Sequence, residues 1–402
     1  MQQVFPEALQ ELAGKSFPCT CGLTHVIHTQ KLVIQRGAIH QVLENGLPGT
    51  PFVIADENTW PLGQEVLGHL PHYILTGDNL HADGCTLGRM LIATADQDIG
   101  YFIALGAGTI GDSVRYLAYR LNKPFVNVCT APSMDGAASC HSPLIHENFK
   151  QTYQAAPPYG VYFDLDIMGA APQDMIAAGY ADVVGKYVAA VDWKLGNLAT
   201  GEHFCPEIQA LTLRAVEKCE ESCAGLVTRE PDAIATLGEA LLLSSLAMQL
   251  NITSRPASGM EHLLSHAWEN LSLKRGERVS LHGDKVGIGT LIACDVYGEF
   301  FKEQRIPDGP VEGIDYQNIL DHWHELKKQS DFLVSIRDRV AAQIQQAGGP
   351  TRPAQLGISP EDVDYALRHM TLGRPRVTIA HLIKALGLED EIYGAVLPRW
   401  VG

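Results

Sequence analysis

YFIALGAGTIGD, residues 101–112, is the stretch that decides the fold of this chain. Its first five residues are apolar and predict a buried strand, and a helical run from 114 to 121 follows it. Between them, Gly106, Gly108 and Gly111 form a G-x-G-x-x-G pattern, which lets pyrophosphate approach the backbone at the positive end of a helix. A structural tight turn explains the same pattern equally simply when it stands alone. The acidic residue that usually follows about 20 positions later is missing from the segment FVN at 125–127.

Two further segments fit a dinucleotide site on a parallel sheet. Asp56 ends the apolar run PFVIA, where its carboxylate could accept hydrogen bonds from a ribose diol; an Asx turn leading into the next helix is an equally good explanation. The turn TAPSMDG at 130–136, with Ser139 after it, follows the next apolar run and is placed to contact nicotinamide or substrate. A loop rich in turn-forming residues is the alternative.

The chain around these segments alternates short apolar runs with amphipathic runs of helical length. Strands are predicted at 31–36, 51–55, 72–75, 101–105 and 125–128, and helices at 38–43, 62–70 and 86–94. Such alternation favours a parallel sheet covered by helices. Long helical runs follow at 173–195, 207–221, 233–250, 259–273 and 317–345. We therefore expect an α/β, atypically Rossmann-like dinucleotide-binding domain over residues 1–166 and an all-α, metal- and substrate-binding domain over residues 167–402.

Composition restricts the possible partners. The chain has 402 residues and a net charge of −16, from 46 acidic and 30 basic residues, which disfavours nucleic acid and anionic membranes. The apolar stretch at 240–252 is interrupted by polar residues and is shorter than the roughly 20 residues that cross a bilayer, so we expect a buried helix and no membrane insertion. Nine scattered cysteines and a first segment without an apolar export signal favour the cytoplasm.

Three segments spread over a hundred residues suggest a metal centre. They are Asp182 with Lys186, Glu261-His262 with His266, and His282 in a turn flanked by Gly283. One carboxylate and two imidazoles can hold a metal at three points and leave positions open for substrate. His262 and His266 share a helix face, and their spacing does not choose between them as ligands. Lys186 could steady Asp182 or attract a substrate phosphate, but a weak surface ion pair is the competing explanation, so it stays outside the catalytic set.

The motifs GAGTIGD, TAPSMDG, AAGYADVVGK, SRPASGMEHLLSH and LHGDKVG occur in this order between about 31 and 289. This combination resembles the bacterial sn-glycerol-1-phosphate dehydrogenases, of the superfamily that includes iron-containing alcohol dehydrogenases and dehydroquinate synthase. The resemblance implies a dehydroquinate synthase-like fold, one divalent metal, zinc or nickel, and NAD(H) or NADP(H). It also implies site residues: for the metal Asp182, His262 and His282; for the cofactor Asp56, Gly108, Thr109, Ile110, Gly111, Asp112, Thr130, Ser133 and Ser139; for the substrate Asp135, Asp182 and His266. Met134 stands where relatives often carry His.

The resemblance implies reversible reduction of dihydroxyacetone phosphate to sn-glycerol 1-phosphate, with hydride transfer to a carbonyl polarised by the metal. Asp182 and His266 are the expected catalytic residues, and His266 could relay the proton. A glycerol or polyol dehydrogenase and a dehydroquinate-synthase-like lyase are the alternatives, although Asp rather than Glu at position 182 favours the dehydrogenase. Asp56 argues mildly for NADH, because a carboxylate beside the ribose repels a 2′-phosphate. Related proteins suggest a homodimer or a larger assembly.

Cys19, Cys21, His25 and His28 near the start of the chain could bind a second zinc ion. A short hairpin with buried cysteines explains the same residues and is the preferred interpretation. Cys129 ends a predicted strand, and we expect it to pack in the core.

Overall fold

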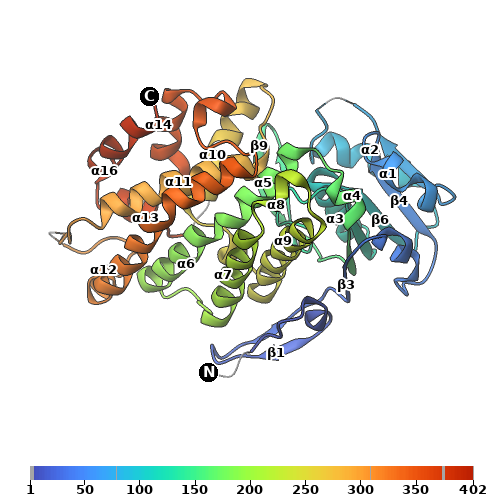
Figure 1. Ribbon diagram of the computed structural model, residues 1–402, viewed down its shortest axis with the longest axis horizontal. Coiled ribbons are helices and arrows are strands. Elements are labelled where there is room, and N and C mark those ends of the chain that lie inside the picture. The colour runs from blue at the N-terminus through green and yellow to red at the C-terminus, as the bar shows by residue number, and fades with distance from the viewer. Residues whose placement is uncertain (1–3, 78, 308, 374–375, 402) are drawn as a thin grey trace.

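A six-stranded sheet, parallel throughout, forms the first half of the molecule (Figure 1). The computed structural model describes residues 4–77, 79–307, 309–373 and 376–401. The strand order across the sheet is β3-β10-β7-β6-β4-β5. In chain order the strands are β3 Lys31–Gln35, β4 Pro51–Asp56, β5 His72–Leu75, β6 Tyr101–Gly106, β7 Phe125–Cys129 and β10 Gly160–Asp164. The predicted α/β fold is confirmed, and β10 is a strand that the prediction missed.

Each sheet face is covered because the central strands are apolar on both sides. Val53 and Ala55 of β4 lie in a core beneath α1 (Trp60–Leu67) and a 3-10 helix at Ala38–Glu44. Phe52 and Ile54 point to the opposite core, which is shared with α2 (Gly84–Thr94) and α3 (Gly108–Arg120). Successive residues of a strand face opposite sides, so a run without polar residues marks a strand buried on both faces. The segment 38–43, which was predicted as a helix, forms part of this 3-10 helix.

Two small antiparallel hairpins flank the sheet. β1 (Ser16–Pro18) pairs with β2 (Thr24–Val26) near the start of the chain, and this hairpin extends below the helices in Figure 1. β8 (His141–His146) pairs with β9 (Phe149–Gln154) between β7 and β10, beside α10. The second hairpin carries Lys150 toward the helical half of the chain, where it meets Glu269.

The rest of the chain is helical. Its helices are α4 Leu165–Gly169, α5 Gln173–Val184, α6 Lys186–Thr200, α7 Pro206–Glu221, α8 Gly225–Thr228, α9 Pro231–Asn251, α10 Met260–Arg275, α11 His282–Phe300, α12 Tyr316–Asp321, α13 Trp323–Gln346, α14 Pro360–His369, α15 Ile379–Ala385 and α16 Glu389–Val396. Two predicted runs are each divided: 173–195 breaks at Gly185, and 317–345 breaks at His322. A periodic apolar pattern continues through such a break, which is why it predicts one helix where the backbone forms two.

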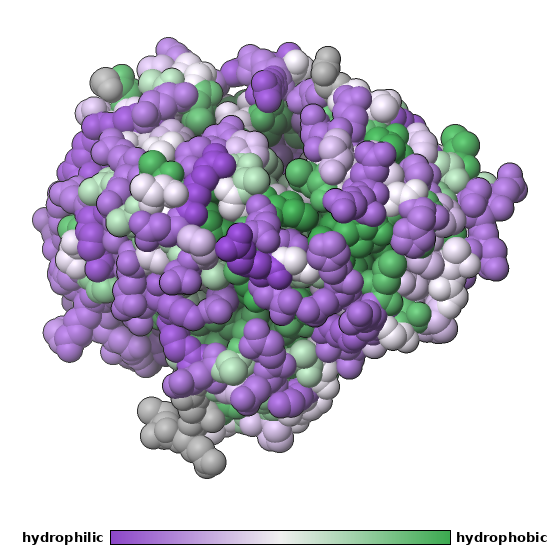
Figure 2. All heavy atoms as spheres, turned by 45° about the vertical axis from the view of Figure 1, so that its right-hand side comes forward, coloured by the Kyte–Doolittle hydropathy of each residue, from purple (hydrophilic) through white to green (hydrophobic). Residues whose placement is uncertain are grey.

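The largest core extends from Phe5 to Trp400 and includes Leu32 and Phe163 of the sheet together with the helices. The sheet and the helices therefore share buried surface, and the boundary proposed at residue 166 stays a prediction. Helix α9 is long and apolar enough for a membrane span by composition alone, but 83% of its apolar window is buried within the protein. This agrees with the buried helix expected at 240–252. The face in Figure 2 is mainly hydrophilic, with apolar residues gathered in a central recess.

Candidate metal and dinucleotide site

Three of the sequence-predicted cofactor segments meet at one edge of the sheet. β6 lies between β4 and β7, and all three run parallel, so their carboxyl ends are neighbours. Asp56 is the last residue of β4, Gly108 begins α3 directly after β6, and Thr130 follows β7. The chain passes from β4 to the edge strand β5 and returns to β6 on the other side of β4. Such a reversal leaves a crevice beyond the strand ends, where ligands of open α/β sheets bind.

The Asp56 carboxylate forms an Asx turn. Its Oδ1 accepts hydrogen bonds from the backbone N–H groups of Asn58 and Thr59, both at 2.9 Å. Both bonds go to the same oxygen, so the turn is compatible with a ligand at Oδ2. The Asx turn that was the alternative explanation for Asp56 is therefore present. The contact of Asp56 with a ribose stays a prediction.

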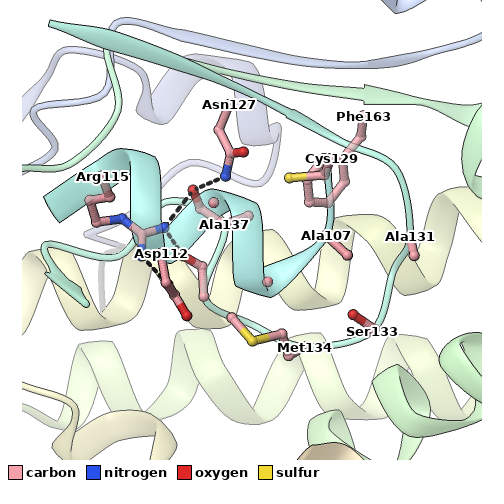
Figure 3. Close-up of a pocket in the computed structure, with 13 residues that line it drawn as sticks. Ala107, Asp112, Arg115, Asn127, Cys129, Ala131, Ser133, Met134, Ala137 and Phe163 are labelled. Atoms are coloured by element: carbon pink, nitrogen blue, oxygen red, sulfur yellow. Dashed lines mark hydrogen bonds and ion pairs between the residues drawn. The ribbon is translucent and has the colours of Figure 1, made fainter. Parts of the chain in front are cut away.

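A cavity of about 320 Å³ lies between the start of α3 and the loop 130–139 (Figure 3). Gly108, Gly111 and Asp112 line it from α3, and Ser133 and Met134 line it from the loop. Thr109, Ile110 and Thr130 do not belong to its described lining. Ile110 and Thr130 are buried, which makes both of them candidates for shaping the turn.

Arg115 fastens this loop to α3. Its guanidinium is 1% exposed, pairs with the Asp112 carboxylate, and donates to the carbonyl oxygens of Gly136, at 2.5 Å, and His141, at 3.1 Å. Burial raises the pKa of Asp112, against the lowering effect of the Arg115 charge. Asp112 therefore acts on the loop through Arg115, whose guanidinium it pairs with. Ser139 has a local bond too, because its Oγ accepts from the backbone N–H of His141 at 3.0 Å.

Asp182, His262 and His282 come together from three helices. One ligand atom from each lies within 4.8 Å of the other two, as a shared metal requires. Asp182 lies in the last turn of α5, His262 in the first turn of α10, and His282 is the first residue of α11. His282 was predicted in a turn, and this is wrong because the helix begins at the histidine itself. The metal-binding role of the three residues remains a prediction.

Two glycines of α11 explain how these helices approach so closely. A Cβ on Gly283 would lie 1.8 Å from the carbonyl oxygen of Ala178 in α5, and a Cβ on Gly289 would lie 2.6 Å from that of Glu261 in α10. Real Cβ atoms do not come this close to a carbonyl oxygen, so any larger residue would force α11 outward. The glycines thereby keep His282 beside Asp182 and His262.

The donor set of this cluster fits a cation. His262 Nδ1 is 2.7 Å from Glu261 Oε1, and His262 Nε2 is 3.6 Å from Asp182 Oδ1. When Nδ1–H is donated to Glu261, the Nε2 lone pair faces a carboxylate oxygen, an arrangement that a metal ion between them stabilises. Glu261 is fully buried, and burial raises its pKa to about 7. Sequence analysis assigned Glu261 no role, although its position directly before a predicted ligand was a usable signal.

Lys186 lies behind the cluster in a buried ion-pair network. Its Nζ is 2.6 Å from Asp182 Oδ1 and 2.9 Å from Asp135 Oδ2, and Ser244 donates to the same Asp135 oxygen at 2.7 Å. Burial raises the pKa of Asp182, helped by the charge of Asp135. Lys186 overcomes burial at Asp135 and lowers the pKa there. The surface ion pair considered for Lys186 is therefore wrong, because all three charged groups are buried.

A second cavity of about 650 Å³ joins the sheet edge to the metal cluster. Asp135, Met134 and Ser139 line it from the loop, and His262, His266 and His282 line it from the helices. The imidazole of His266 is 5.9 Å from that of His282, between ring centroids. His266 is outside the three-residue cluster, so the geometry separates the two histidines that spacing could not.

Among the described residues that line this second cavity, one is a Lys or Arg, and it is Lys150. Its Nζ lies 2.9 Å from Glu269 Oε1, and Lys285 lies 3.4 Å from the other Glu269 oxygen. Burial acts to raise the pKa of Glu269, but the two lysines lower it to about 2. Burial also lowers the pKa of His282 well below its ordinary value, and the charge of Lys150 adds to this. Nothing in the sequence pattern pointed to Lys150, because it lies in an unpredicted hairpin.

Comparison with known proteins places the chain among dehydrogenases. Residues 50–172 match the family model described as iron-containing alcohol dehydrogenase. Glycerol-1-phosphate dehydrogenase (NAD(P)+) of Halalkalibacterium halodurans is 32% identical over 91% of this chain and 95% of that protein. The enzyme of the same name from Bacillus subtilis is 34% identical over 75% and 74%. Among solved structures, a probable glycerol dehydrogenase from Sinorhizobium meliloti has a TM-score of 0.68 at 17% identity, covering 91% of this chain and 96% of that one.

Proposed function

Because the chain belongs to the glycerol-1-phosphate dehydrogenase family, we propose that it interconverts dihydroxyacetone phosphate and sn-glycerol 1-phosphate with NAD(P)(H). The observation that carries the proposal is identity of 32% across nearly the whole length of a relative with that name. The Asp182, His262 and His282 cluster supports it, because a dehydrogenase of this kind needs a Lewis acid beside its substrate.

Asp182, His262 and His282 would hold one divalent ion, and we propose zinc or nickel, both of which accept imidazole and carboxylate ligands. When bound, the ion would polarise the C2 carbonyl of the substrate, and the dinucleotide would supply the hydride. Glu261 fixes the ring of His262, and such a partner typically strengthens metal binding. Lys186 compensates the charges of Asp135 and Asp182, so the cluster can form before an ion arrives.

We propose that the pyrophosphate of the cofactor lies at the start of α3, near Gly108 and Gly111, where N–H groups and the helix dipole favour an anion. The nicotinamide would then reach the loop 130–139 in the cavity shared with the metal cluster. Asp56 at the end of β4 would accept hydrogen bonds from the ribose hydroxyls. Its negative charge would favour NADH over NADPH, which carries a 2′-phosphate.

The substrate would occupy the 650 Å³ cavity, with its carbonyl toward the metal cluster and its phosphate toward Lys150. Lys150 already contacts Glu269, so it is held at the cavity wall and its ammonium group is oriented before binding. His266 lines the same cavity and can donate or accept the proton that the alcohol oxygen exchanges. Asp135 would contact the substrate beside Lys186.

A coupled test measures nucleotide oxidation by protein reconstituted with zinc or nickel, with dihydroxyacetone phosphate or dihydroxyacetone as substrate. We expect a much higher kcat/KM with the phosphorylated substrate, and chiral analysis should identify the sn-1 product. In K150M the KM for dihydroxyacetone phosphate should rise about tenfold or more, as expected for a lost charge-assisted contact. K123M changes an exposed lysine away from the cavity and is the matched control.

Equal kcat/KM for the two substrates would instead favour the polyol dehydrogenase. Net consumption of nucleotide separates both dehydrogenases from a lyase that regenerates its cofactor. The proposal also includes a cytoplasmic homodimer, and light scattering of the purified protein would test whether it is a dimer.

A further inference from the structure

A second group of metal-ligand side chains shares no residue with the first. Cys19 and Cys21 lie at the tip of the β1–β2 hairpin, His25 is in β2 opposite Phe17, and Cys205 is the residue directly before α7. One ligand atom from each of the four lies within 4.8 Å of the others. The hairpin turn is closed by bonds from Cys19 N–H to the Leu23 carbonyl, at 3.0 Å, and from Gly22 N–H to the Cys19 carbonyl, at 3.1 Å.

Three of the distances within this group are close to the edges of a tetrahedral zinc site. Zinc–sulfur and zinc–nitrogen bonds of about 2.3 and 2.0–2.1 Å give tetrahedron edges of about 3.8 Å between sulfurs and about 3.5 Å between sulfur and nitrogen. The Sγ atoms of Cys19 and Cys205 are 3.6 Å apart. His25 Nε2 is 3.3 Å from the Cys21 sulfur and 3.4 Å from the Cys205 sulfur. A disulfide would need the two sulfurs at about 2.05 Å.

The histidine is already oriented for such a site. His25 is 2% exposed, and its Nδ1 is 2.8 Å from the carbonyl oxygen of Leu250. Donation of Nδ1–H to that carbonyl leaves the Nε2 lone pair facing the sulfurs, which is how metal-bound histidines are usually held. His28, also a candidate from the sequence, is exposed and lies outside the group.

We propose that Cys19, Cys21, His25 and Cys205 bind one structural zinc ion, separate from the site at Asp182. Four protein ligands close the coordination sphere, as in structural zinc sites, whereas catalytic sites keep one position open. Three sulfur ligands favour zinc over magnesium or calcium. The sequence favoured buried cysteines without metal because Cys205 was not recognised as a fourth ligand. It lies 186 positions after Cys19.

The zinc ion would tie the N-terminal hairpin to the helical half of the molecule. Leu250, which fixes His25, is at the end of α9, and the neighbouring Gln249 accepts a hydrogen bond from His28 N–H at 3.1 Å. The Gln249 amide also donates to Thr29 Oγ1, at 2.8 Å, and to the Ala138 carbonyl. The zinc site is thereby connected through two adjacent residues to the loop 130–139 of the cofactor cavity.

Cobalt substitution and metal analysis test this proposal without reference to activity. We expect two ions per chain in wild-type protein reconstituted with zinc, and Co²⁺-loaded protein should show a sulfur-to-cobalt charge-transfer band in the near ultraviolet. C205S and the C19S/C21S variant should each lose one ion and this band. H282A should lose the other ion and keep the band, because the site at Asp182 contains no sulfur ligand. C85S changes an exposed cysteine outside the group and is the matched control.

Two results would overturn the proposal. One is Co²⁺-loaded wild-type protein that lacks the sulfur band while the Asp182 site is filled. The other is mass spectrometry of alkylated protein that finds Cys19 and Cys205 joined by a disulfide. If the cysteine variants do not fold, alkylation of the wild type decides: chelator treatment should expose three additional reactive thiols when zinc protects them, and none otherwise.

Discussion

Replacing Lys186 with Met should strongly destabilise the metal-free protein. Lys186 Nζ lies 2.6 Å from Asp182 and 2.9 Å from Asp135, and all three side chains are buried. At an effective dielectric constant of about 20, each contact represents about 6 kcal/mol of gross attraction. Desolvation offsets most of this, but removing one partner leaves the carboxylates facing each other, and such changes cost about 3–5 kcal/mol. We expect K186M to lose that much free energy of unfolding.

The metal dependence of K186M provides a second, independent signature. A divalent ion at Asp182 would replace the lost positive charge, so added zinc should raise the stability of K186M more than that of the wild type. The double variant K186M/D135N removes one of the two facing carboxylates and should recover about 1 kcal/mol or more. Denaturant titrations of the apo and zinc-loaded proteins measure both effects.

K218M is the control for loss of a lysine in general, because Lys218 pairs with Glu239 at the surface and is 53% exposed. Its change should stay below about 1 kcal/mol. The reasoning fails if apo K186M unfolds at the same denaturant concentration as the wild type, or if zinc stabilises both equally.

Three further predictions follow from the site. Glu261→Gln should weaken zinc binding about 10–100-fold, measured by chelator competition, while Glu277→Gln on the surface should leave it unchanged. Asp56→Ser keeps a side chain able to accept the turn bonds but removes the charge, so the NADPH to NADH ratio of kcat/KM should rise on the order of tenfold. Glu269, whose pKa falls from 4.5 to about 2, contributes about 3 kcal/mol above pH 4.5 that disappears as the pH falls toward 2. Unfolding titrations of Glu269→Gln should therefore lose that part of the acid dependence, and an unchanged slope would contradict the assignment.

The parallel sheet could be predicted because its central strands are buried on both faces and leave continuous apolar runs between helical segments. β10 was missed because GVYFD ends a stretch of turns and hairpins without clear periodicity. Asp182, His262 and His282 were identified by resemblance to a family, since spacing alone left His266 as an equal candidate. Their proximity depends on the contacts of Gly283 and Gly289 with neighbouring helices, and such long-range packing has no local sequence pattern.

The same limit explains the residues that sequence analysis missed. Lys150 meets Glu269 across 119 positions, and Cys205 meets Cys19 across 186 positions. Lys186 was weighed as a surface residue because helical spacing predicts which residues are neighbours but not whether their shared face is buried. Pairing between distant segments decided the first two cases and burial decided the third, and only the folded chain supplies either quantity.

The proposed ligands at Asp182, His262 and His282 belong to helices α5, α10 and α11, whereas the proposed nucleotide contacts belong to the end of β4, the start of α3 and the loop after β7. Metal binding and nucleotide recognition therefore depend on different residues and can change separately. Substitutions around the three helices can exchange one metal for another without changing the choice between NADH and NADPH, and substitutions at the end of β4 can do the reverse. Enzymes of this kind can thus adapt to the metal that is available and to the nucleotide that is available in independent steps.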